Sequence, residues 1–356
     1  MRSFIGLSLF LMCFLHAPMS LGQTFFFTGG VDNDFFNELN WTANSDGTGA
    51  NPAGDPLVDS TTGAIALDLI IDGDTVDAAG QVDFGTGSMT LESGSVFNVT
   101  GAGNDLDING SSSFFLTNAT LMTNGDAIFE GTVSMIGGSV TSVTDDVEFQ
   151  DNFVSLSIDG TSFTSGAGSQ TTFFDGFAGS ITNASFTTTG RLGLRNSVSV
   201  VMTNTTLDIN GGGSDVENVF SGLATGSSLT LNGTSTLLAD SMEEDVALIL
   251  DDDAAATLGG AGVRITADAS TITLNSLGAS LTVSGALDTG DTDYIDSRPF
   301  LINGSTGIDY ATDSSTWNIT NWNGVDAVTL QIVPEPGSVI LALGGIAALA
   351  AIRRRQ

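Results

Sequence analysis

The sequence predicts an all-β protein, a right-handed parallel β-helix (solenoid) with about 22 residues per coil and β-structured caps, followed by a C-terminal transmembrane helix. Three observations predict this fold: a composition suited to short strands and turns, segments in which apolar and polar residues alternate, and a phrase that recurs along the chain. Gly accounts for 45 of the 356 residues and Phe for 22, and 41% of the chain is hydrophobic, which is sufficient for a core.

The recurring phrase begins with Gly or Asn, continues with Ser or Thr, and leads into an apolar residue of an alternating segment, as in Asn118-Ala119-Thr120-Leu121 and Asn183-Ala184-Ser185-Phe186. Because a constant coil length returns the same face on each turn, these apolar residues are expected to form one buried column. The column would comprise Val96, Leu121, Val140, Phe163, Phe186, Leu207, Leu229, Leu250 and Ile272. A β-sandwich is the alternative, since short strands at half this spacing would suit it.

The chain is expected to begin with a signal peptide at residues 1–22. Arg2 provides a positive start, residues 4–15 form an apolar core of signal-peptide length, and Ser20 and Gly22 are small residues where a signal peptidase reads the chain. The sequence therefore predicts export through the Sec machinery and a mature chain that begins near Gln23.

Residues 23–80 are expected to form an N-terminal cap and the first strands. Phe27-Thr28-Gly29-Gly30 and Asn40-Trp41 resemble the start of exported β-helical proteins of the autotransporter-passenger type. This resemblance implies a cap over the open end of the solenoid, where strand edges would otherwise aggregate. Residues 81–290 are expected to form the coils, and residues 291–332, with aromatic residues on short strands, the opposite cap.

The segment 333–356 combines three features in order. Val333-Pro334-Glu335-Pro336 keeps the chain extended, because proline cannot continue a helix. Residues 338–352 are uncharged and largely apolar, which predicts a short transmembrane helix. The arginines at 353–355 would then be held at the cytoplasmic face of the membrane.

This order of features resembles the PEP-CTERM sorting signal, found on exported proteins of Gram-negative bacteria that make exopolysaccharide. The resemblance implies that an exosortase removes the tail by recognising the motif residues, namely Val333, Pro334, Glu335, Pro336, Arg353, Arg354 and Arg355. The protein would be anchored transiently in the inner membrane and would then reach the cell surface or the extracellular matrix.

Charge and composition exclude several chemistries. The chain has no lysine, and its one Cys (Cys13) and one His (His16) lie in the expected signal peptide. Between residues 23 and 333 the 8 basic and 41 acidic residues become 4 and 40, a formal charge of −36. Ser-His and Cys-His catalysis, zinc sites with His or Cys, and disulfides are therefore excluded from the mature chain. A basic patch for nucleic acid is absent as well.

Acidic residues are the candidate ligands for a metal ion. An acidic exported chain attracts divalent cations, and calcium prefers carboxylate and carbonyl oxygens. The sequence predicts no required cofactor, but candidate calcium ligands at Asp105, Asp107, Glu243, Glu244, Asp251, Asp252 and Asp253. The alternative for these residues is a set of acidic turns exposed to solvent.

No catalytic residue is assigned. A glycosidase needs two facing carboxyl groups, one with a raised pKa, and adjacent acids such as Asp145-Asp146 are expected in solvated loops. A lyase needs a basic residue, for which Arg191 and Arg195 are the clustered candidates. Rows of outward Thr on a β-helix can bind ice or carbohydrate, but Thr230, Thr273 and Thr282 do not form sustained Thr-x-Thr ranks in the sequence.

The sequence thus indicates an exported, non-enzymatic surface or extracellular-matrix protein with a structural or adhesive role. Its expected partners are the Sec machinery, exosortase and extracellular polysaccharide, with the inner membrane before processing and no nucleic acid. The alternative is a polysaccharide-acting hydrolase or lyase on the same scaffold.

Overall fold

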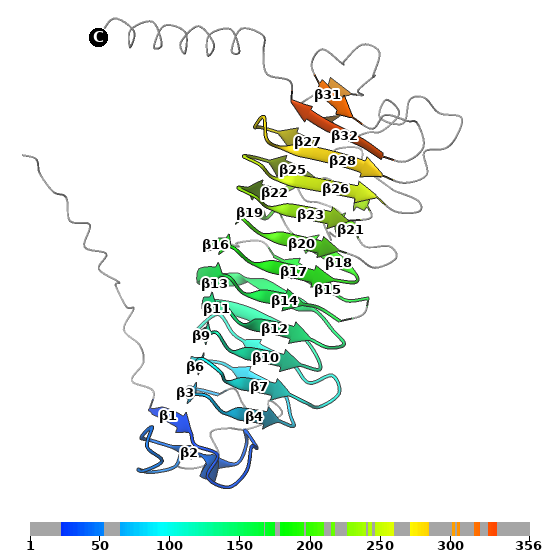
Figure 1. Ribbon diagram of the computed structural model, residues 1–356. Coiled ribbons are helices and arrows are strands. Elements are labelled where there is room, and N and C mark those ends of the chain that lie inside the picture. Colours follow the sequence, from blue (N-terminus) through cyan, green and yellow to red (C-terminus); the bar gives the residue numbers. More distant parts are fainter. Residues whose placement is uncertain are drawn as a thin grey trace, which may run out of the picture.

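The computed structural model shows a rod of stacked β-strands, a parallel β-solenoid (Figure 1). It describes residues 23–52, 65–166, 168–174, 179–195, 197–209, 215–217, 226–239, 241–243, 246–259, 271–284, 301–302, 305–306, 317–320 and 327–332. Regular structure in these ranges is β-strand apart from the short 3-10 helix η1 (Glu38–Asn40), and none of it is a helix long and apolar enough to cross a membrane. The expected signal peptide (1–22), sorting segment (333–356) and transmembrane helix (338–352) lie outside the described residues.

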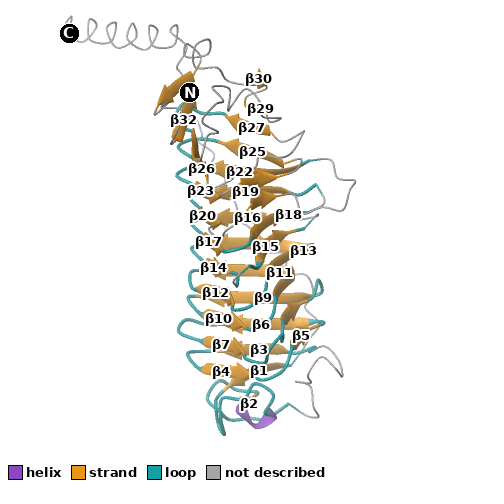
Figure 2. Ribbon diagram, turned by 90° about the vertical axis from the view of Figure 1, so that its right-hand side faces the viewer, coloured by secondary structure: helices purple, strands orange, loops and turns teal. Residues whose placement is uncertain are grey.

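The strands of the coils form three parallel ladders, which we call ladders I, II and III. In Figure 2, ladder II runs up the middle of the rod between ladder III and ladder I. Ladder I contains β5 (Val82–Phe84), β8 (Leu106–Ile108), the first parts of β11 (Ala127–Ile136) and β13 (Val147–Asp159), β15 (Gln170–Phe173), β18 (Arg191–Leu194), β21 (Asp215–Glu217) and β24 (Ser241–Glu243).

Ladder II contains β1 (Thr24–Phe27), β3 (Asp68–Ile71), β6 (Gly87–Leu91), β9 (Ser112–Thr117), the second parts of β11 and β13, β16 (Gly179–Thr182), β19 (Ser199–Thr203), β22 (Ser227–Asn232), β25 (Val246–Leu250), β27 (Thr271–Leu274) and β29 (Leu301–Ile302). Because β11 and β13 run through the corner between ladders I and II, these two ladders form one 20-stranded sheet.

Ladder III is the parallel part of the 12-stranded sheet. It contains β4 (Thr75–Ala78), β7 (Val96–Val99), β10 (Thr120–Thr123), β12 (Ser139–Ser142), β14 (Ser162–Thr164), β17 (Ser185–Thr188), β20 (Thr206–Ile209), β23 (Thr236–Ala239), β26 (Ala255–Gly259) and β28 (Ser280–Ser284). The prediction of an all-β parallel solenoid is therefore confirmed, and the sandwich alternative is wrong.

The corner between ladder II and ladder III explains the recurring phrase. This corner needs a residue with positive φ, which Gly adopts without a Cβ penalty and Asn tolerates better than most residues. Positive-φ residues at this corner include Asn118 (47°), Gly137 (63°), Gly160 (76°), Asn183 (51°) and Asn204 (51°). The corner also continues the stack, because the Asn183 amide donates to Asp159 Oδ1 of the preceding coil at 2.7 Å.

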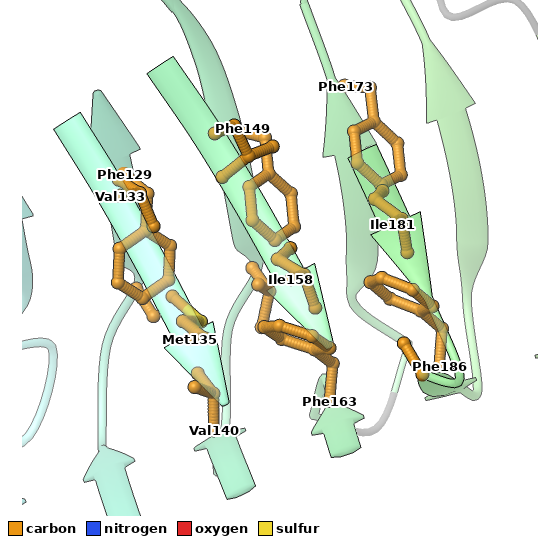
Figure 3. Packing of buried hydrophobic residues seen from close by; sticks show 14 of the residues in the cluster. Phe129, Val133, Met135, Val140, Phe149, Ile158, Phe163, Phe173, Ile181 and Phe186 are labelled. Carbon is orange, nitrogen blue, oxygen red and sulfur yellow. The ribbon is translucent and has the colours of Figure 1, made fainter. Parts of the chain in front are cut away.

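The interior is filled by columns of apolar side chains. The Phe163 and Phe186 rings of ladder III stack at 4.7 Å, and the Phe149 and Phe173 rings of ladder I stack at 4.9 Å (Figure 3). The two stacks meet edge to face, with 5.5 Å between the ring centroids of Phe149 and Phe163. The buried column of ladder III consists of Val76, Phe97, Leu121, Val140, Phe163, Phe186, Leu207, Leu237, Ala256 and Leu281.

The expectation of a single column running from Val96 to Ile272 is wrong. Leu121, Val140, Phe163, Phe186 and Leu207 do stack, but Val96 is half-buried and Phe97 takes its place in the column. Leu229, Leu250 and Ile272 are buried on ladder II instead. The reason is that the ladder III partner of Leu207 is Leu237, 30 residues later, so a step of about 22 residues lands on a different strand of the coil.

The two ends of the solenoid carry different structure. At the N-terminal end, the Phe35 N–H donates to the Asp77 carbonyl of β4 at 2.8 Å, and Trp41, in β2 (Trp41–Thr42), is fully buried. At the C-terminal end, β28 pairs antiparallel with β32 (Ala327–Ile332), which also pairs with β31 (Trp317–Thr320), and Leu330 is buried. A short antiparallel pair joins β29 to β30 (Ser305–Thr306).

Leu207→Asp is expected to lower the free energy of unfolding by about 3 kcal/mol or more, because it places an unpaired charge inside the column. Leu207 is 1% exposed, whereas Leu238, on the next strand of the same ladder, is 42% exposed and serves as the matched site. Urea denaturation followed by circular dichroism measures both variants. Equal losses for Leu207→Asp and Leu238→Asp would contradict the assignment of the two faces.

Candidate functional site

The outer face of ladder I gathers acidic side chains, and we call it the acidic face. Its outward positions hold Asp83 on β5, Asp107 on β8 and Glu148 on β13, with Ile128 of β11 between the last two. Asp83 and Asp107 are register partners on neighbouring strands, so their backbones lie about 4.8 Å apart. The stacking of coils therefore concentrates negative charge that is spread out in the sequence.

A chain of carboxylates lines the corner that leads into ladder I. Asp105 Oδ1 accepts the N–H of Asp126 at 2.8 Å, and Asp126 Oδ1 accepts the N–H of Asp146 at 2.9 Å. Asp146 Oδ1 in turn accepts the N–H of Gln170 at 2.7 Å. Each carboxylate thus satisfies a backbone donor of the next coil, which holds the acids in place at the spacing of the coils.

Burial and mutual repulsion raise the pKa of several of these acids. Burial, followed by the charges of Asp83, Glu130, Asp105 and Glu148, raises the pKa of Asp107 to about 6. The pKa of Asp126 is also raised to about 6, mainly by burial.

The pKa values of Asp146 and Glu148 are raised as well. Burial raises the pKa of Asp146 and of Glu148 above their ordinary values, although the nearby charge of Arg195 acts against both shifts. The Gln150 amide also donates to Glu148 Oε2 at 2.6 Å and opposes the shift of that carboxyl group. Burial thus favours the protonated form of Asp107, Asp126, Asp146 and Glu148.

Three of the acids come close enough to share a cation. Oxygens of Asp126, Asp145 and Asp146 lie within 4.8 Å of one another, and across the described residues this is the one such group of three acidic side chains. Oxygen ligands in such a set suit calcium, which takes carboxylates in flexible geometry. The arrangement can therefore hold a divalent cation between two neighbouring coils.

The residues predicted as calcium ligands lie at separate places. Asp105 and Asp107 belong to the acidic face, where Asp105 contacts the backbone of Asp126 but is not one of the three clustered acids. Glu243 lies in β24, of whose side chains nothing is described, and Glu244 lies outside the described residues.

Asp251, Asp252 and Asp253 form a corner of the solenoid. Asp251 accepts hydrogen bonds from the Ser276 hydroxyl and, at 2.9 Å, from the Asp252 N–H, which hold its pKa below the ordinary value. Asp252 Oδ2 accepts the N–H of Gly233 at 3.1 Å. These carboxylates thus brace the backbone of neighbouring coils.

Sequence reasoning missed Asp126, because this acid has no acidic neighbour in the chain. The signal that would have found it is recurrence at the length of a coil. Asp105, Asp126 and Asp146 are separated by 21 and 20 residues. Acids repeated at the coil length stack in space, whereas adjacent acids such as Asp145 and Asp146 share only a turn.

The two clustered arginines lie on one coil of ladder I, in β18 and directly after it, two coils beyond β13. Arg191 pairs in register with Gln170 and Asp215, and it is exposed. The Arg195 guanidinium lies 4.8 Å from the centroid of the Phe174 ring, a cation–π contact. The charge of Arg195 offsets part of the negative charge around Asp146 and Glu148.

Stability is expected to rise when the pH falls from 7 to about 4.5. A carboxyl group whose folded pKa is about 6 and whose ordinary value is 3.8 binds more protons in the folded state between these values. Its stabilising contribution is complete below the lower pKa and is lost as the pH rises through the higher one. Urea denaturation at constant ionic strength measures the difference, which Asp107→Asn with Asp126→Asn should reduce. Asp251→Asn should not reduce it, because the lowered pKa of Asp251 acts in the opposite direction. An unchanged pH dependence in the double variant would contradict this assignment.

Millimolar calcium is expected to raise the melting temperature more than sodium chloride of matched ionic strength, because a cation that binds only the folded state stabilises it by mass action. Asp145→Asn with Asp146→Asn should abolish the difference, and Asp252→Asn with Asp253→Asn should preserve it. If the second pair abolishes it instead, the cation belongs to the corner at residues 251–253. Equal shifts with both salts would refute calcium binding.

Comparison with protein-family models gave no match, and comparisons with curated proteins and with solved structures gave none either.

Proposed function

We propose that this chain is an exported structural or adhesive protein of the bacterial surface or extracellular matrix, sorted by an exosortase in an exopolysaccharide-producing bacterium. The observation that carries the proposal is the segment 333–356, with Pro-Glu-Pro, an apolar stretch and three arginines in that order. In this proposal the signal peptide ends at residue 22 and residues 338–352 form the transmembrane helix. The coils wind right-handed, as parallel crossovers nearly always do.

The solenoid supports a structural role. A rod held by continuous backbone ladders is stiff, and columns of buried apolar side chains fill its interior. The formal charge of −33 for the whole chain suits solubility outside the cell and disfavours binding to anionic polymers. Extracellular polysaccharide is therefore the proposed partner, with the acidic face free to take up cations.

Polysaccharide hydrolysis is the second candidate function, and one observation favours it. Asp83 and Asp107 are register partners about 4.8 Å apart at the backbone, and the pKa of Asp107 is raised to about 6. Retaining glycosidases use two carboxyl groups about 5 Å apart, one of them protonated near neutral pH. Release of reducing sugar that Asp107→Asn abolishes would favour the enzyme over the structural role.

The exported protein is expected to begin near Gln23 and to lack Arg353, Arg354 and Arg355 in a host that contains an exosortase. Mass spectrometry of the mature protein measures both ends. Pro334→Ala with Pro336→Ala should leave the tail in place, because the variant removes the two prolines of the motif while the apolar segment and arginines remain. An intact arginine terminus on the mature wild-type protein would remove the sorting proposal.

A further inference from the structure

The outward face of ladder III carries hydroxyl groups in two columns. The first column contains Thr120, Ser139, Ser162, Ser185, Thr206 and Thr236, and the second contains Thr141, Thr164, Thr187, Thr257 and Thr282. Ranks of the form Ser-x-Thr run through β12, β14 and β17, although Thr-x-Thr ranks are not sustained along the face. The expected Thr230 and Thr273 lie on ladder II, where Ile249 separates them, and only Thr282 is on this face.

This face is almost free of charge. Within the strands β4 to β28 of ladder III, the charged side chains are Asp77 and Asp208, at the outward positions of β4 and β20. The mature chain nevertheless has 40 acidic and 4 basic residues, and ladder I concentrates acids on its outer face. The contrast between the two faces means that a ligand on ladder III meets hydroxyl groups without a strong local charge.

The hydroxyl groups form a rigid and regular array. Neighbouring strands place them about 4.8 Å apart along the rod, and alternate residues place them about 6.6 Å apart along each strand. Thr is stiff at χ1, and the Ser185 hydroxyl donates to Ser162 Oγ at 2.9 Å, so these groups lose little freedom when a ligand binds. An extended polymer lying along the rod would meet a hydroxyl of the first column on each coil from β10 to β23.

We propose that the outward face of ladder III binds a neutral polysaccharide in an extended conformation, lying along the axis of the rod. The proposal rests on the proposed adhesive role and names the surface that would carry it. The strong negative charge of the protein disfavours both an anionic polymer and a second copy of this chain. A neutral sugar chain escapes this repulsion and offers hydroxyl groups to each coil.

Exposed apolar side chains on the same face favour a sugar chain over ice as the ligand. Met122 and Leu238 are 39% and 42% exposed at outward positions of the second column, and Asp208 interrupts the column as well. These side chains break the lattice that an ice surface would require. They suit a sugar chain, whose C–H groups pack against apolar side chains while its hydroxyl groups bond to Ser and Thr.

The test compares two pairs of charges on the same two coils. Thr164→Glu with Thr187→Glu places two carboxylates on ladder III, and Ser157→Glu with Ser180→Glu places two on ladder II. All four residues are exposed, and each pair consists of register partners, so repulsion between the new charges is matched. Binding of the full mature chain is measured by depletion onto microcrystalline cellulose and by affinity electrophoresis in hydroxyethylcellulose, with polygalacturonate as the anionic polymer and partition into growing ice as a further arm.

The wild-type protein should bind the neutral polymers and not polygalacturonate. The ladder III pair should weaken binding by about tenfold or more, and the ladder II pair by less than about twofold, with equal melting temperatures for the two variants. Equal weakening, or none, would overturn the assignment to ladder III while leaving adhesion intact. Wild-type binding to none of these polymers would overturn both the inference and the adhesive role, although processing of the tail would still be judged by mass spectrometry. Partition into ice without polysaccharide binding would assign the face to ice instead.

Discussion

The backbone hydrogen bonds between coils are the interaction on which the rest of this structure depends. Parallel pairing in register sets the distance between equivalent residues of neighbouring coils, whatever their side chains are. Any residue type that recurs at the coil length therefore becomes a column in space. The stacked Phe rings inside, the carboxylate chain of Asp105, Asp126 and Asp146, and the hydroxyl ranks of ladder III are three results of the same constraint.

Stacking at the spacing of the coils stabilises the fold for some side chains and destabilises it for others, depending on their charge. Aromatic rings gain from being stacked, and amides and hydroxyls can donate to the equivalent residue of the next coil. Carboxylates repel one another at this spacing unless they are protonated, bonded to backbone N–H groups, or bridged by a cation. The acidic face shows the first two of these responses, in the raised pKa of Asp107 and in the N–H donated by Asp146 to Asp126.

The solenoid could be predicted from the sequence because its corners need unusual backbone conformations. Asn118, Gly160 and Asn183 have positive φ, and few residue types adopt it, so the corner is visible as a repeated phrase. The assignment of each strand to a ladder could not be predicted in the same way. All three ladders alternate apolar and polar residues, and Leu229 and Leu237 fit an inward position equally well in the sequence. Only the pairing of Leu207 with Leu237 separates them.

The candidate sites were even harder to predict from the sequence, because they form only when each strand is assigned to its ladder. Asp126 comes close to Asp145 and Asp146 only because the turn before β11 stacks on the turn before β13, and the hydroxyl ranks exist only once the strands are aligned. A search for adjacent residues could find neither feature. The acids at Asp251 and Asp252, which are adjacent in the chain, turned out to hold the corner of a coil together.

The pairing of Leu207 with Leu237 shows that a coil of the rod can be longer than its neighbours while its strands stay in register. The two residues are paired in register although they are 30 positions apart in the sequence, whereas the paired residues Thr120 and Ser139 are 19 positions apart. Additional chain can thus leave a coil and return without disturbing the strands above and below it. In evolutionary terms such a rod can acquire new surface loops one coil at a time. The same property makes this coil a place where a foreign peptide can be displayed on the intact scaffold.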